Sequence, residues 1–196
     1  LWAWIFGSGA DLAGVENDGP WAVAYLANWH FIIDSTGYWA SFAQPKMFDH
    51  LWSLAIEEQF YLLWPIVLVA IWKWSRRPTR TLVIVTGSAV ALSFLSMLWL
   101  YDGVEPTRVY MGTDTRAASL LVGALAATPP VRRLARRVVA FLGNRTGIVL
   151  AALAVFIGWS WIAVDGASSG LLYRGGLLAH SLACAAIISL VVALDG

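Results

Sequence analysis

Charged residues are scarce in this sequence. Only 13% of its 196 residues are Asp, Glu, Lys or Arg, whereas soluble domains carry roughly 25%. Three stretches contain no charged residue at all, namely residues 82–100, 146–164 and 175–194. Each is close to the about 20 residues that a helix needs to cross the hydrocarbon of a bilayer. The composition therefore excludes an ordinary soluble domain and predicts an integral membrane protein in contact with the lipid bilayer.

Cysteine and an excess of charge of either sign are also missing. The single Cys184 excludes a disulfide framework within the chain, and we interpret it as a small buried residue. A net charge of +1 gives no basis for a nucleic-acid partner. We find no histidine and cysteine spacing typical of a metal site, so we expect no metal and no bound cofactor. The 12 tryptophans instead favour a membrane interface.

The hydrophobic pattern predicts an all-α fold, a polytopic transmembrane helical bundle. We expect five full spans and the tail of a truncated N-terminal one at residues 1–6; the full spans are residues 51–74, 82–100, 115–131, 146–164 and 172–194. Polar residues 7–20 and 34–49 are interpreted as loops, and the short apolar stretch 21–33 as an interfacial segment. Because both ends are apolar, we expect residues 1–196 to form a single transmembrane domain that is incomplete at both ends.

The orientation follows from the basic residues. Nine of the 13 lie in two short stretches without acidic residues, residues 73–80 and 132–145. Such loops stay on the cytoplasmic side of a membrane. The loops at residues 34–49, 102–112 and 165–169 are then predicted to lie outside.

Two adjacent carboxylates, Glu57 and Glu58, fall inside the first predicted full span. An ionisable group at this depth costs several kcal/mol unless it is paired or hydrated, and it usually marks a functional site. Helical periodicity places His50, Glu57 and Tyr61 on one face, whereas Glu58 points about 100° away. The sequence therefore predicts a polar stripe that faces the bundle or a cavity.

A second polar group precedes the predicted span at residues 115–131. Thr113 or Asp114 is suited to cap this helix, but Arg116 in its first turn opposes the helix dipole. We expect Arg116 to pair with Asp114, with Glu57 or Glu58, or with a substrate. The topology places both residues near the outer face, together with the polar stripe.

A structural role stays open for each of these residues. His50 suits a cap at the membrane surface and Glu58 suits the start of a helix. Tyr61 is equally compatible with ordinary packing, and Arg116 with an arginine that extends to the interface.

Three blocks of this sequence resemble a known family. Residues 50–65, H-L-W-S-L-A-I-E-E-Q-F-Y-L-L-W-P, are similar to the signature of the acyltransferase 3 family of membrane acyltransferases. Residues 112–117, G-T-D-T-R-A, followed by L-L-V-G at 120–123, resemble a second block, and residues 26–29, L-A-N-W, a weaker third. The resemblance covers residues 26–123; the later helices agree with the family only as apolar spans.

The resemblance implies an all-helical membrane enzyme with about ten spans in full. Such enzymes transfer an acyl group, often acetyl, from cytoplasmic acyl-coenzyme A to a hydroxyl of a glycan or another outer-surface acceptor. The family's usual catalytic histidine has no match in this sequence, and we expect it to precede Leu1. Its role is therefore not transferred to His50.

We predict a membrane O-acyltransferase of the bacterial plasma membrane, with acyl-CoA as donor and a cell-surface glycan as acceptor. Acylation of a hydroxyl needs a base and stabilisation of an oxyanion. Candidate catalytic residues are Glu57 and His50; candidate substrate-binding residues are Asn28, Trp52, Ser53, Tyr61, Asp114 and Arg116. Trp52 and Tyr61 are suited to stack on a sugar ring. The alternatives are a proton-coupled secondary transporter of a small polar solute and a non-catalytic membrane scaffold.

Overall fold

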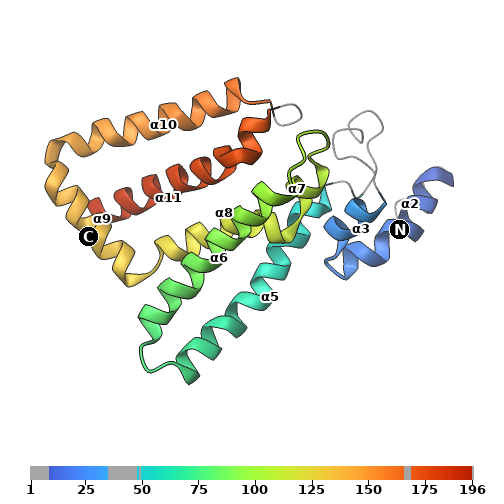
Figure 1. Cartoon of the computed structure of the whole chain (residues 1–196), viewed down its shortest axis with the longest axis horizontal. Coiled ribbons are helices and arrows are strands. Elements are labelled where there is room, and N and C mark those ends of the chain that lie inside the picture. The colour runs from blue at the N-terminus through green and yellow to red at the C-terminus, as the bar shows by residue number, and fades with distance from the viewer. Residues whose placement is uncertain (1–8, 35–47, 49, 166–168, 196) are drawn as a thin grey trace.

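Helices make up every regular element of the part of the chain that the computed structural model describes, residues 9–34, 48, 50–165 and 169–195 (Figure 1). The all-α prediction is therefore confirmed for these residues. The predicted truncated span at residues 1–6 lies outside the described part, as does most of the predicted loop at 34–49.

Four helical segments are long and apolar enough to cross a membrane. They are α5 (Leu51–Trp74), α6 (Pro78–Leu100), the combined segment Pro129–Ala163, and Leu172–Leu194. The bounds of α5 agree with the predicted span. Between 6% and 22% of the most apolar window of each segment is buried within the chain. Their apolar surfaces therefore face outward, as expected of helices in lipid or against further protein.

The third predicted span is shorter than expected. The helix at this position, α8 (Thr113–Ala126), has 14 residues and extends about 21 Å at about 1.5 Å per residue. A second helix, α9 (Pro129–Leu142), occupies the stretch that we predicted as the end of this span and a basic loop. Two prolines explain the break, because Pro suits the first turn of a new helix but cannot continue an existing one. The count of five full spans is thus not confirmed.

The prediction of a loop at residues 7–20 is wrong from residue 9 onward. Helix α2 (Gly9–Val23) forms there and is followed by α3 (Ala27–Ile33). Tertiary contacts explain this helix: Asp18 is 5% exposed and lies 3.0 Å from Nε2 of His30, and the Trp21 ring stacks on His30 with centroids 5.2 Å apart. Such contacts offset the poor helix propensity of a segment rich in Gly and acidic residues.

Hydroxyl groups of serines form hydrogen bonds between the long helices. The Ser93 hydroxyl of α6 accepts a bond from the Ala118 amide of α8 at 2.9 Å, and Ser181 of α11 (Leu177–Leu194) donates to Ser119 of α8 at 3.0 Å. Short polar side chains of this kind let helices approach closely in a membrane. Figure 1 shows the result: α8 lies along α6, while α10 (Thr146–Ala163) and α11 lie side by side.

The last predicted span is interrupted near its start. Residues Leu172–Gly176 form a π-helical turn before α11, and Gly175 has a φ of 137° that favours glycine. The turn buries Tyr173 completely, and its ring lies 5.0 Å from Tyr101 and 6.4 Å from Tyr110. This end of α11 is therefore fixed to the end of α6 and to the short helix α7 (Thr107–Met111).

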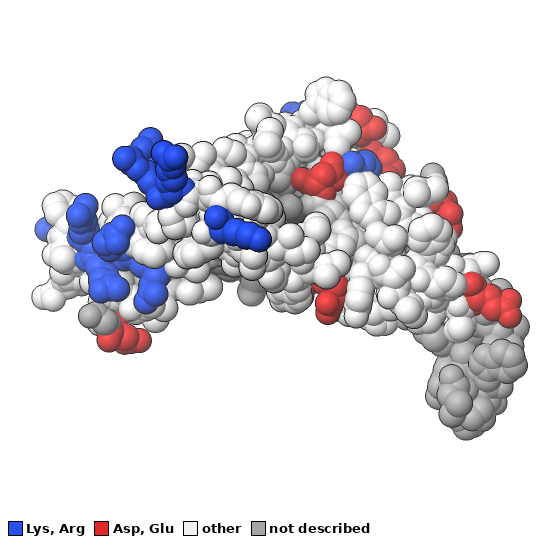
Figure 2. Space-filling model, turned by 90° about the horizontal axis from the view of Figure 1, so that it is seen from below, with Lys and Arg blue, Asp and Glu red and all other residues white. Residues whose placement is uncertain are grey.

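Basic and acidic side chains separate along the molecule. On the face in Figure 2, Lys and Arg gather toward one end, and most Asp and Glu lie toward the other. The basic end contains the α5–α6 turn and α9, the two stretches that the sequence predicts to be cytoplasmic. The predicted orientation assigns the opposite end, with α2, α3 and α7, to the outer side.

Candidate functional site at the outer ends of α3, α5 and α8

Four helices meet at the acidic end of the molecule. The first turns of α5 and α8 pack there against α3 and α7. An apolar cluster lies beneath the polar groups and comprises Ala27, Phe31, Trp52, Ala55, Ile56 and Met111. All three sequence blocks that resemble the acyltransferase family contribute to this meeting point.

A closed ring of three side chains connects these blocks. Asn28 of α3 donates through Nδ2 to the Thr113 hydroxyl of α8 at 2.9 Å, and Thr113 donates to Oε1 of Gln59 at 2.7 Å. Gln59 of α5 closes the ring by donating through Nε2 to Oδ1 of Asn28 at 3.0 Å. Two further bonds reach the backbone, from Asn28 to the Met111 carbonyl at 3.0 Å and from Gln59 to the Tyr25 carbonyl at 2.7 Å. The ring therefore fixes the positions of α3, α5 and α8 relative to one another.

Asn28 joins helices through this ring. Its side chain is fully buried, and both of its amide hydrogens are used within the protein. Its predicted role in substrate binding stays a prediction beside this structural role. Removing one member of such a partly buried ring costs about 1–3 kcal/mol, because the others are left unsatisfied.

The loop between α6 and α7 is held by two carboxylates. Oδ1 of Asp102 accepts bonds from the backbone amides of Val104 at 2.8 Å and Glu105 at 3.2 Å. These two bonds lower the pKa of the Asp102 carboxyl below 3.8. Glu105 in turn accepts bonds from the amide and the hydroxyl of Thr107, at 3.2 and 2.6 Å. The chain therefore enters α7 in a defined direction, which sets the position of Arg108.

Asp114 forms its ion pair with Arg108. The two terminal guanidinium nitrogens of Arg108, Nη1 and Nη2, donate to the two carboxylate oxygens of Asp114 at 2.9 Å. Both side chains are about one third exposed. The guanidinium also lies over the ring of Trp29, 5.1 Å from its centroid. Our sequence prediction considered Arg116 as the partner and Asp114 as the cap. The cap position is instead Gly112, and Asp114 lies in the first turn of α8, where a negative charge suits the helix dipole.

Arg116 is connected to α5 through aromatic rings. Its guanidinium lies 5.2 Å from the centroid of Tyr110, and that ring lies 5.0 Å from Trp52. Trp52 is 7% exposed and belongs to the apolar cluster. Trp52 therefore packs within this cluster, and its role in sugar stacking stays a prediction.

The predicted stripe lies on the opposite face of α5. The buried face carries residues 52, 55, 56 and 59, at the spacing of a helix in contact with neighbours. His50, Glu57 and Tyr61 are all exposed, as is Ser53, and the exposed fraction of Tyr61 is 59%. Glu57 points about 160° away from Gln59, which contacts α8. The stripe and the Asp114 pair therefore share one end of the molecule but lie on different sides of α5.

Three residues of this site were missing from the prediction. Gln59 and Thr113 lie within the quoted blocks, and their neutral side chains carried no signal of the kind that a buried charge gives. Arg108 lies six residues before Asp114, a separation that only the turn between α7 and α8 brings into contact. Among the described residues, no group of three or more His, Cys, Asp or Glu side chains is placed to hold a metal ion.

Comparison with known proteins identifies the class. The chain is a multi-pass membrane protein homologous to bacterial membrane O-acetyltransferases. It is 40% identical over 176 residues to the peptidoglycan O-acetyltransferase OatA of Listeria monocytogenes, which is 85% of this chain and 27% of that protein. It is 37% identical over 179 residues to the putative peptidoglycan O-acetyltransferase YrhL of Bacillus subtilis, or 90% of this chain and 28% of that protein.

A putative O-acetyltransferase of Staphylococcus aureus is 32% identical over 193 residues, 93% of this chain and 30% of that protein. The chain therefore spans less than one third of the length of these relatives. No protein-family model and no solved structure matches it. The homology agrees with the membrane acyltransferase resemblance that the sequence blocks indicated.

Proposed function

We propose that the full-length protein is a membrane O-acetyltransferase that transfers an acetyl group from acyl-coenzyme A to a hydroxyl of peptidoglycan. The homology to peptidoglycan O-acetyltransferases over 85–90% of this chain carries the proposal. The joining of the three sequence blocks by one partly buried hydrogen-bond ring supports it, because the ring holds these three helices together.

The proposed chemistry divides the site residues into two groups. Asn28, Gln59 and Thr113 hold the helices in place, and Arg108 orients Asp114. Glu57, His50, Ser53 and Tyr61 lie on the exposed face of α5 and are the groups that can reach a substrate or another part of the protein. A fixed framework beside an accessible polar face is what catalysis by positioning requires.

Glu57 is proposed as the central residue of the accessible face. A carboxylate is not retained at a lipid-facing position without a partner or water. The chain accounts for less than one third of the length of its relatives, so we propose that the remainder of the full-length protein faces this stripe. Glu57 would there orient or polarise a general base for the acceptor hydroxyl.

The experiment measures O-acetylation of the cell wall. The full-length gene is expressed in a host that lacks this modification, and alkali-released acetate is quantified from purified peptidoglycan. We expect acetate to be released from the peptidoglycan of cells that express the wild-type protein. In membrane preparations supplied with isotope-labelled acetyl-CoA, the released acetate should carry the label. Transport of a solute across vesicles without covalent modification of glycan would overturn the proposal in favour of a transporter.

A further inference from the structure

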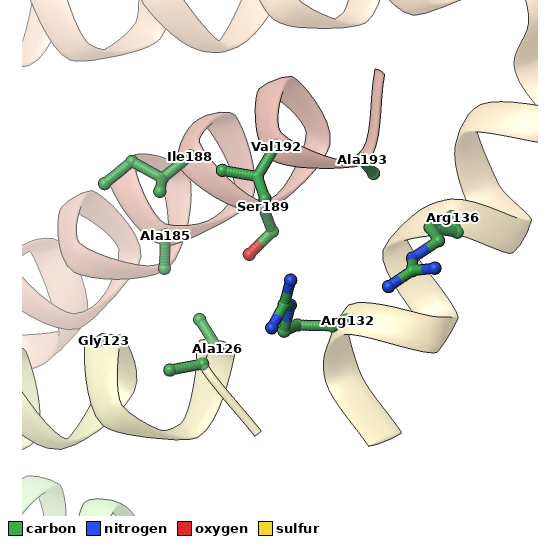
Figure 3. Close-up of a pocket in the computed structure, with 10 residues that line it drawn as sticks. Gly123, Ala126, Arg132, Arg136, Ala185, Ile188, Ser189, Val192 and Ala193 are labelled. Carbon is green, nitrogen blue, oxygen red and sulfur yellow. The ribbon is translucent and has the colours of Figure 1, made fainter. Parts of the chain in front are cut away.

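A cavity lies at the basic end of the molecule, far from the site described above. Its volume is about 340 Å³, and it lies between the last turns of α8 and α11 and the first half of α9 (Figure 3). Small or apolar side chains form its walls: Gly123, Ala126, Ala185, Ile188, Val192 and Ala193. Small side chains on α8 and at two positions of α11 leave an apolar space, which suits an acyl or other linear chain.

Two arginines stand at the mouth of this cavity. Arg132 and Arg136 are one helical turn apart on α9, and Figure 3 shows both guanidinium groups on the side that faces α11, with Arg132 directed toward Ser189. Among the described residues that line the cavity there is no Asp or Glu. The cavity therefore combines an apolar interior with two adjacent cationic forks and a hydroxyl.

The position of α9 gives the cavity its orientation in the membrane. α9 is amphipathic, with arginines on one face and Leu134 and Phe141 exposed by 58% and 89% on another part of its surface. Such a helix lies in the interface plane of a bilayer. Its four arginines place it on the cytoplasmic side, so the mouth of the cavity lies at the depth of the inner-leaflet phosphates.

The C-terminal ends of two helices attract these arginines. α8 and α11 both end beside the cavity, and the free carbonyls of helix C-termini attract cations. This attraction holds the guanidinium groups near the mouth, but each fork has five donors and retains capacity for an anion.

We propose that this cavity binds a phosphate ester carried on a linear chain, with Arg132 and Arg136 holding the phosphate and the apolar walls holding the chain. Two ligands have this chemistry: coenzyme A, whose thioester is the donor of the proposed function, and an anionic phospholipid of the inner leaflet. In the first case the inference rests on the proposed function; in the second it stands without it. Guanidinium forks bind phosphate oxygens through paired, charge-assisted hydrogen bonds.

The test uses the full-length protein in dodecyl maltoside, a detergent without phosphate. One arm titrates coenzyme A, with pantetheine as the ligand that lacks phosphate. The other arm adds dioctanoyl phosphatidylglycerol, with dioctanoylglycerol as the ligand that lacks phosphate, and detects retained lipid by native mass spectrometry. We expect one of the two phosphate ligands to bind at least about tenfold more tightly than its phosphate-free counterpart.

Matched variants test the site itself. Arg132→Ala/Arg136→Ala should weaken binding at least about tenfold. Arg133→Ala/Arg137→Ala, which removes the same charge from the same helix but no residue that lines the cavity, should leave binding near the wild-type value. Ala185→Leu keeps all four arginines and narrows the cavity, so it should also weaken binding while the thermal unfolding midpoint stays similar.

The outcomes separate the two proposals. Equal weakening by both double variants, or no preference of the wild-type protein for either phosphate ligand, overturns the cavity assignment. Acetyl transfer measured on the same preparations distinguishes this from failure of the proposed function. If Arg132→Ala/Arg136→Ala leaves both acetyl transfer and ligand binding unchanged, only the proposed binding cavity is overturned. If the wild-type protein retains phosphatidylglycerol but transfers no acetyl group, only the proposed acetyltransferase function is overturned.

Discussion

Glu57 and Glu58 are neighbours in sequence with different surroundings. Glu57 is exposed on the face of α5 that carries His50 and Tyr61, whereas Glu58 is partly buried at the edge of the packed face. One pair of adjacent carboxylates on a helix always diverges by about 100°. The two residues therefore offer a matched comparison in which charge and depth in the membrane are nearly constant.

Glu57→Gln is expected to reduce acetyl transfer by about 100-fold, in the range that loss of acid–base assistance produces. The replacement has almost the same shape and lies at an exposed position, so the free energy of unfolding should change by no more than about 0.5 kcal/mol. Acetate release from peptidoglycan and protein abundance in membranes are the two measurements.

Glu58→Gln is the control and should leave most of the activity. Small and equal effects of the two substitutions would show that the exposed stripe has no part in the reaction. A large loss of membrane-inserted protein with Glu57→Gln would instead indicate a structural role for this carboxylate.

At the scale of the element, the turn between α7 and α8 depends on one glycine. Gly112 has an ordinary φ of −68°, so its backbone conformation does not require glycine. A Cβ at this position would overlap the Arg108 guanidinium and carbonyl and the Asp114 carboxylate. Glycine is thus required here because the Arg108–Asp114 ion pair lies against its Cα and leaves no space for a side chain.

Gly112→Ala is therefore expected to separate Arg108 from Asp114 and to destabilise the protein by about 1–3 kcal/mol, as overpacking commonly does. The thermal unfolding midpoint of the detergent-solubilised full-length protein measures this effect. Gly123→Ala, within α8, is the control: its Cβ meets nothing within 4 Å, so it should be neutral or stabilising. An unchanged midpoint for Gly112→Ala would refute the close packing of this turn.

The elements differ in how far their sequence predicts them. The bounds of α5 were predicted because most of its 24 residues are apolar, enough to cross a membrane. α2 was missed because its glycines and acids are typical of a loop, and the buried Asp18–His30 contact that supports the helix joins residues 12 apart. The ring of Asn28, Gln59 and Thr113 was unpredictable for the same reason, since its members are separated by 31 to 85 residues and none carries a charge.

At the scale of the whole molecule, α8 decides how many times the chain crosses the membrane. Its 14 residues are short for a full crossing, yet it leads from α7 at the acidic end to α9 at the basic end (Figure 1). We propose that α8 does cross, with α9 lying in the inner interface. The loop between α6 and α7 and the residues directly after α9 then lie on opposite sides of the membrane.

Single cysteines test this topology in a Cys184→Ala background. Val104 in the α6–α7 loop is 85% exposed, and Asn144 after α9 is exposed as well. We expect Val104→Cys to react with a membrane-impermeant maleimide in intact cells and Asn144→Cys to react only after permeabilisation. Reaction of both cysteines in intact cells would place α8 as a helix that does not cross.

The ring that joins α3, α5 and α8 has a further property. None of its three side chains gains or loses a proton over any pH at which a cell survives, and none attracts counterions. The Arg108–Asp114 pair beside it is partly exposed and weakens as salt rises. A rise in ionic strength would therefore weaken the ion pair while the spacing of the three helices stayed constant. The joint between the three helices is thus insensitive to the acidity and the salt content of its surroundings.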